Sequence, residues 1–176
     1  MPRITNAAID IGAYERQSLN LNVDTAIDES DGNHGPGALS LREALLLASN
    51  NAGHDVIEFA PTLAGSTITL AMGELMIDDD LTLVGLGADQ LTVSGNNASR
   101  VFNIAATAAV DMSELTIRNG RAFAGGGGIV NSGTLRITAS TVVDNIGIHG
   151  GGLFNFGTLS VESSLIFGNS AGEGFT

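Results

Sequence analysis

The chain has 176 residues, of which 43% are hydrophobic and 15% charged, a balance that excludes a disordered acidic tail and suffices for one continuous core. Its 19 acidic and 7 basic residues give a formal net charge of -12, which disfavours phosphate backbones and anionic lipid surfaces, so we expect no nucleic-acid partner and no membrane insertion. The 24 glycines and 3 prolines favour short strands joined by tight turns.

Carboxylates crowd a polar segment ahead of the first predicted helix. Asp24, Asp28 and Asp31 lie there, and the run 28–33 reads Asp-Glu-Ser-Asp-Gly-Asn. Such oxygen ligands with a glycine for the turn suit calcium. Their spacing does not follow the EF-hand pattern, and a polar loop that leads into the helix explains the same residues. We expect no cofactor, with calcium as the one candidate.

A helix is predicted over residues 40–50. Ser40 and Glu43 have the spacing of a capping box, in which each side chain accepts a hydrogen bond from the backbone N–H of the other residue. Leu41 and Leu45 lie on one apolar face, and Asn50 begins the stop signal. A lone amphipathic helix ahead of a run of strands is suited to covering the open end of their core.

Short strand-like segments with alternating apolar side chains follow the helix. They are Val56–Phe59, Thr67–Leu70, Glu74–Ile77, Leu81–Val84, Leu91–Ser94 and Val101–Ile104. The connections between them are too short for crossover helices. We therefore expect strands that follow one another around a coil.

The second half of the chain repeats itself. The segment from Gly128 to Ile137 recurs from Gly152 to Val161, an offset of 24 residues without a gap. Within it the strand-like runs Thr134–Thr138 and Thr158–Glu162 have apolar residues at alternate positions. A repeat of this length suits one coil of a solenoid.

Asparagines recur at fixed places in these repeats. The predicted columns are Asn103–Asn131–Asn155 and Asn119–Asn145–Asn169. Stacked side-chain amides satisfy one another's hydrogen bonds at turns, so these residues are interpreted as internal ladders with a stabilising role.

These patterns predict an all-β fold: a right-handed parallel β-helix with a short N-terminal capping α-helix. An antiparallel sandwich also has short strands and tight turns. It gives no reason, however, for the same residues to recur at one fixed period.

The run Leu39–Ala44 looks like the Cys-Ser-Leu-Arg-Glu-Ala signature of bacterial secreted β-helix proteins, with Leu39 in place of the usual cysteine. The glycine-rich elements Gly126–Asn131 and Gly150–Asn155 resemble repeats of polymorphic outer membrane proteins and autotransporter passengers. The resemblance implies a right-handed parallel β-helix that is secreted or displayed at the cell surface.

The segment Pro2–Glu15 is similar to the one that usually closes such a β-helix unit. We therefore expect a unit-closing segment of a preceding or neighbouring unit in residues 1–17, a leading loop and capping helix in residues 18–55, and coils open at the C-terminal end in residues 56–176. Two explanations fit this order. The chain spans a junction in a tandem array, or its first segment completes the last coil of a neighbouring copy.

The expected function is non-enzymatic: a structural or adhesive extracellular module. Its expected partners are copies of itself bound end to end or neighbouring units, and glycans or surface proteins. The alternative is a polysaccharide lyase or glycoside hydrolase of the β-helix type. Asp111, Glu114 and Asp144 are candidates for stacked carboxylates, with Arg118 and Arg136 on strands.

Overall fold

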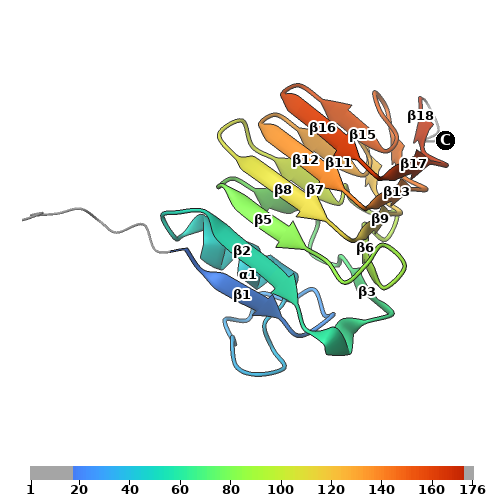
Figure 1. Cartoon of the computed structure of the whole chain (residues 1–176). Coiled ribbons are helices and arrows are strands. Elements are labelled where there is room, and N and C mark those ends of the chain that lie inside the picture. The colour runs from blue at the N-terminus through green and yellow to red at the C-terminus, as the bar shows by residue number, and fades with distance from the viewer. Residues whose placement is uncertain (1–17, 173–176) are drawn as a thin grey trace, which may run out of the picture.

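The computed structural model describes residues 18–172. In it the chain winds into a parallel β-helix, in which successive coils stack along one axis (Figure 1). Every strand pair between successive coils is parallel, from β1 with β2 (Asn20 beside Val56) to β12 with β16 (Thr134 beside Thr158). The predicted fold class is therefore confirmed.

Four parallel sheets form the walls of the solenoid. The six-stranded sheet contains β1 (Asn20–Val23), β2 (Asp55–Phe59), β5 (Leu81–Val84), β8 (Ala109–Ser113), β12 (Thr134–Thr138) and β16 (Thr158–Glu162). The five-stranded sheet contains β3 (Ser66–Thr69), β6 (Leu91–Ser94), β9 (Thr116–Arg118), β13 (Thr141–Val143) and β17 (Leu165–Phe167). The four-stranded sheet contains β4 (Leu75–Ile77), β7 (Phe102–Ile104), β11 (Ile129–Asn131) and β15 (Leu153–Asn155). The three-stranded sheet contains β10 (Arg121–Ala122), β14 (Ile146–Gly147) and β18 (Ser170–Ala171).

The core is a set of apolar columns that run along the solenoid axis. Because strand side chains alternate and the coils pair in parallel register, each inward position meets a like position one coil away. Leu83 pairs with Met112, which pairs with Ile137, and all three side chains are buried. The predicted 24-residue register also holds, since Leu135 lies beside Leu159.

Helix α1 (Leu41–Ser49) lies against the first coils, near β1, β2 and β4 (Figure 1). Its inward face, with Leu41 and Leu45, belongs to the main hydrophobic cluster. A short 3-10 helix, η1 (Pro61–Leu63), follows β2. The N-terminal end of the core is thus covered by a helix, as its amphipathic pattern predicts.

Several elements were not named from the sequence, among them β8, β11, β13, β15, β17 and η1, and two further cases have a clear physical reason. Strand β1 lies in the segment expected to be a leading loop, and it pairs with β2 as the first strand of the six-stranded sheet. The three-stranded sheet was also missed, because its strands are only two residues long and each contains or adjoins a glycine. The predicted unit-closing segment, residues 1–17, lies outside the described residues.

Candidate functional site

The capping box closes the N-terminal end of α1. Ser40 is the N-cap residue, and its hydroxyl oxygen accepts a hydrogen bond from the Glu43 N–H at 3.1 Å. The Glu43 carboxylate accepts one from the Ser40 N–H at 3.2 Å. Leu41 and Leu45 point into the core with exposed fractions of 1% and 5%. The four predicted capping residues thus lie together at the covered end of the solenoid.

Glu43 also ties the polar loop to the helix, a role that its sequence position does not reveal. Its second oxygen accepts hydrogen bonds from the backbone N–H groups of Asp31 and Gly32 at 3.1 and 2.9 Å. Burial alone raises the pKa of Glu43, but hydrogen bonds from Ser40 and Gly32 outweigh this effect and hold the pKa below its ordinary value. The carboxylate is therefore stabilised in its charged form.

A partly buried ion pair joins the same loop to the first coils. The Arg42 guanidinium donates to both oxygens of Asp28, at 2.7 and 3.1 Å, and to the carbonyl oxygens of Gly73 and Glu74. Asp28 also accepts from two N–H groups just after β3, those of Ala71 and Met72. Burial raises the pKa of Asp28, yet these hydrogen bonds together hold it below its ordinary value.

The cap should therefore loosen in acid. The folded-state pKa of each carboxylate lies below its ordinary value, which is 3.8 for Asp28 and 4.5 for Glu43. Both carboxylates therefore contribute their full stability at a pH above these ordinary values. That contribution is lost as the pH falls through the lower folded-state values. We expect the thermal unfolding midpoint, followed by circular dichroism, to drop steeply below about pH 4. The Glu43→Gln variant should have a lower unfolding midpoint at neutral pH and a smaller drop in acid. A drop as large as that of the wild type would contradict the role of the Glu43 carboxylate in the cap.

The calcium candidates are not gathered into one cluster. Asp24 accepts from the N–H groups of Gly37 and Leu39, Asp28 binds Arg42, and Asp31 accepts from the Asn33 N–H. Within residues 18–172, no three His, Cys, Asp or Glu side chains are placed so that they could hold a metal ion. Calcium binding stays a prediction.

Asparagine ladders are present in the later coils. Asn131 donates from Nδ2 to Oδ1 of Asn155 at 2.6 Å, and Asn145 donates likewise to Asn169 at 2.9 Å. Asn131 and Asn145 are fully buried. These four residues therefore lie in two columns, where their amides link consecutive coils.

The upstream alignment of both columns is wrong by one residue. Ile104, not Asn103, lies beside Asn131, and Asn103 donates to the Glu74 carboxylate instead. In the other column Gly120 occupies the place expected for Asn119, and its N–H donates to Oδ1 of Asn145 at 2.7 Å. The predicted columns imply offsets of 28 and 26 residues to this earlier coil, whereas the observed offsets are 27 at Ile104 and 25 at Gly120, because its corners differ in length from those of the later coils.

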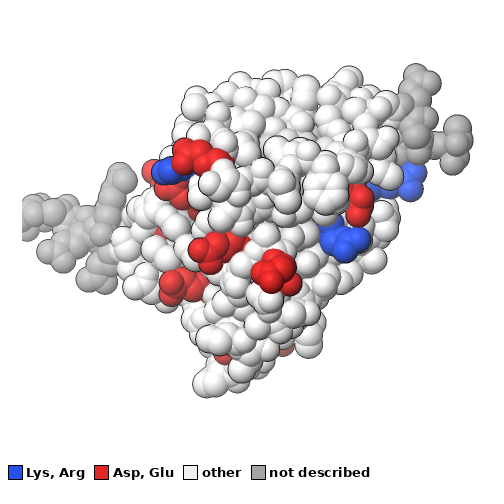
Figure 2. All heavy atoms as spheres, turned by 45° about the vertical axis from the view of Figure 1, so that its right-hand side comes forward, with Lys and Arg blue, Asp and Glu red and all other residues white. Residues whose placement is uncertain are grey.

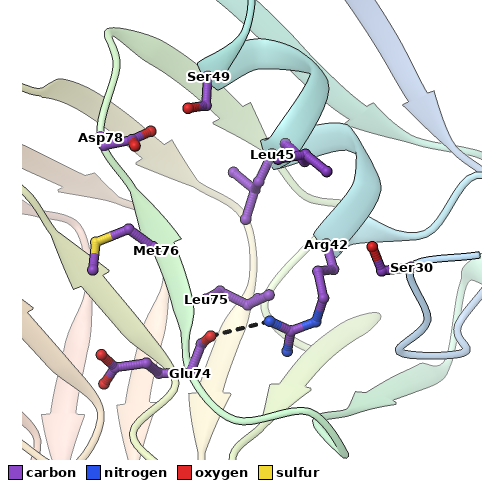
Figure 3. A pocket seen from close by; sticks show the side chains of 9 residues that line it. Ser30, Arg42, Leu45, Ser49, Glu74, Leu75, Met76 and Asp78 are labelled. Atoms are coloured by element: carbon purple, nitrogen blue, oxygen red, sulfur yellow. Dashed lines mark hydrogen bonds between the residues drawn. The ribbon is translucent and has the colours of Figure 1, made fainter. Parts of the chain in front are cut away.

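A groove of about 290 Å³ separates α1 from β4. Figure 3 shows Arg42 reaching across it from the helix to the Glu74 carbonyl oxygen, with Leu45 and Met76 on facing sides. The lining residues are Ser30, Arg42, Leu45, Leu46, Ser49, Glu74, Leu75, Met76 and Asp78. Its walls are mainly apolar and Arg42 is already occupied, so this composition does not select one class of ligand.

A shallow hollow of about 360 Å³ on the six-stranded sheet brings together some residues of the enzyme alternative. Asp111, Glu114 and Arg136 line it, whereas Asp144 instead pairs with Arg118 at 3.4 Å. Arg136 and Glu162, both about half exposed, form an ion pair at 2.9 Å. The hollow thus offers two carboxylates and an arginine that is already paired.

The last coil exposes apolar side chains at inward positions, which are buried one coil earlier. Val161 and Ile166 are 38% and 48% exposed, while their partners Ile137 and Val142 are fully buried. Phe156, Leu165 and Phe167 add further apolar surface. In Figure 2 uncharged side chains cover the upper part of the molecule, where the last coils lie, and most carboxylates lie below. Among residues 18–172, nothing covers this end of the core as α1 covers the other end.

The fold and its two unlike ends define a parallel β-solenoid that is capped at one end. The chain matches no protein-family model, no curated protein and no solved structure. Among residues 18–172, no helix is long and apolar enough to cross a membrane.

Proposed function

We propose that the chain is a non-enzymatic structural module, secreted or displayed at the cell surface, that stacks end to end with copies of itself or with neighbouring units through its last coil. The observation that carries this proposal is the exposure of Val161 and Ile166 in register with buried core positions. Burying an apolar side chain of this size contributes about 1.5–3 kcal/mol, so a further coil on this surface would be strongly favoured.

The backbone supports the same proposal. Strands β15 to β18 end their sheets, and among the described residues their outer edges have no strand partner. An exposed apolar strand edge readily pairs with another chain. The lateral walls, by contrast, present the polar outward positions of many strands, and we propose that they serve adhesion to glycans or surface proteins. The hollow at Asp111 and Arg136 keeps the carbohydrate-active enzyme as the alternative, which an assay for polysaccharide cleavage decides.

Light scattering over a range of protein concentrations tests the proposed association. We expect the mass to rise with concentration, and Val161→Asp to weaken association at least tenfold, because a charge replaces an apolar contact worth more than about 1.4 kcal/mol. Thr134→Asp is the matched control, since Thr134 is exposed on β12, one coil away from the proposed contact, and should leave association unchanged. A monomeric mass at every concentration would contradict end-to-end association.

A further inference from the structure

The exposed end of the solenoid defines what kind of segment can cover it. In the preceding coil β14 is followed by β15 in the four-stranded sheet and then by β16 in the six-stranded sheet. A further coil would therefore follow β18 with one strand that pairs with β15 and then a second strand that pairs with β16. The second of these must place apolar side chains over Leu159 and Val161, the inward positions of β16.

The N-terminal segment of the chain has the residue pattern that this position requires. Ala8-Ile9-Asp10-Ile11 matches Ala109-Val110-Asp111-Met112 of β8 type by type, and in β8 the valine and methionine are buried while the aspartate is exposed. Ahead of it, Ile4-Thr5-Asn6 has the apolar-x-Asn pattern of Leu153-Phe154-Asn155 in β15. The corner between the two patterns is one residue shorter than between β15 and β16.

We propose that residues 4–11 of a second copy form the next coil on this end, with Ile9 and Ile11 over Leu159 and Val161 and Asp10 beside Ser160. The inference rests on the proposed end-to-end association and names the segment that makes it. It places Asn6 near the exposed end of the Asn131–Asn155 ladder, where Asn155 has a neighbour on one side within the described residues.

The chain's own segment reaches this position only at the limit of its length. Asn20 begins β1, at the opposite edge of the six-stranded sheet, and a strand beyond β16 lies six strand spacings away, about 29 Å. Nine residues join Ile11, the last residue of the proposed strand, to Asn20, and they span at most about 30–32 Å when fully extended. A link within one chain would therefore need every intervening residue to be fully extended, whereas a second copy meets no such limit.

Cross-linking between singly substituted chains tests the register, because the protein contains no cysteine. Asp10→Cys and Ser160→Cys chains are mixed under conditions in which the wild type associates, and a disulfide is induced by mild oxidation. We expect a mixed dimer, since the two positions would be about 5 Å apart on adjacent strands. Asp111→Cys replaces Ser160→Cys as the control: it occupies the same outward position two strands further in, on β8, and should give no mixed dimer.

A double variant tests the role of the segment in assembly. Ile9→Asp with Ile11→Asp should reduce association at least tenfold, whereas Asp10→Asn, at the outward position, should leave it unchanged. Association that persists in the double variant, or that gives no Asp10–Ser160 link, would overturn this inference while leaving end-to-end stacking in place. A wild-type chain that never associates would overturn both proposals.

Discussion

Replacing Leu45 with aspartate is expected to be among the most damaging single changes in the described part of the protein. Leu45 is 5% exposed and belongs to the core cluster beneath the cap. Removing a buried leucine costs about 2–5 kcal/mol, and a carboxylate at this site adds a desolvation penalty. We expect a loss of about 5 kcal/mol in the free energy of unfolding, measured by urea denaturation with circular dichroism, together with aggregation through the uncovered end.

The neighbouring residue provides a matched control. Leu46 lies on the same helix but is 54% exposed, so Leu46→Asp should change the free energy of unfolding by no more than about 0.5 kcal/mol. A soluble Leu45→Asp chain with an unaltered denaturation midpoint would contradict the role of α1 as the cover of the core.

The second large effect is expected at Asn145. Its Oδ1 accepts from the Gly120 N–H, and its Nδ2 donates to the carbonyl oxygens of Ile117 and Val143 at 3.1 and 3.0 Å. Because Asn145 is fully buried, Asn145→Ala removes three hydrogen bonds to backbone groups, at about 1–3 kcal/mol each. We expect a destabilisation of about 4 kcal/mol in the same denaturation experiment.

Asn169, at the exposed end of the same ladder, provides the control for Asn145. It donates to the carbonyl oxygens of Val142 and Phe167, but it lies in the last coil, where water can replace it. Asn169→Ala should therefore cost only about 1 kcal/mol in the isolated chain. Equal effects of the two substitutions would show that the ladder is not stabilised by its burial.

The parts of the fold that are predictable from sequence are those set by local or strictly periodic patterns. The 24-residue repeat fixes β12 and β16 to the residue, and the capping box lies within four consecutive residues, Ser40 to Glu43. Strand β1 escapes prediction because it has four residues with polar neighbours. Its partner β2 is 36 residues away, so only the assembled sheet defines it.

The contacts of Arg42 could not be predicted from the sequence, because they join residues that are far apart along the chain. Arg42 stands within the signature-like run Leu39–Ala44, yet its partners Asp28 and Gly73 are 14 and 31 residues away. No spacing in the sequence joins them. The misplaced Asn103 and Asn119 have a different cause. The earlier coil is a less regular copy whose corners differ in length, so its asparagines were matched by residue type, and an error of one residue moves a side chain to the other face of a strand.

A change in chain length would affect the cap and the coils of this solenoid differently. The cap, built from α1 and its loop, is specified once, whereas a coil such as residues 129–152 pairs in parallel with both the coil before it and the coil after it. Duplication of a whole coil would thus lengthen the rod by about 5 Å and leave both termini unaltered, while an insertion of a single residue would put its inward side chains into solvent. The length of this solenoid can therefore change in steps of one whole coil without a change in the packing of its core.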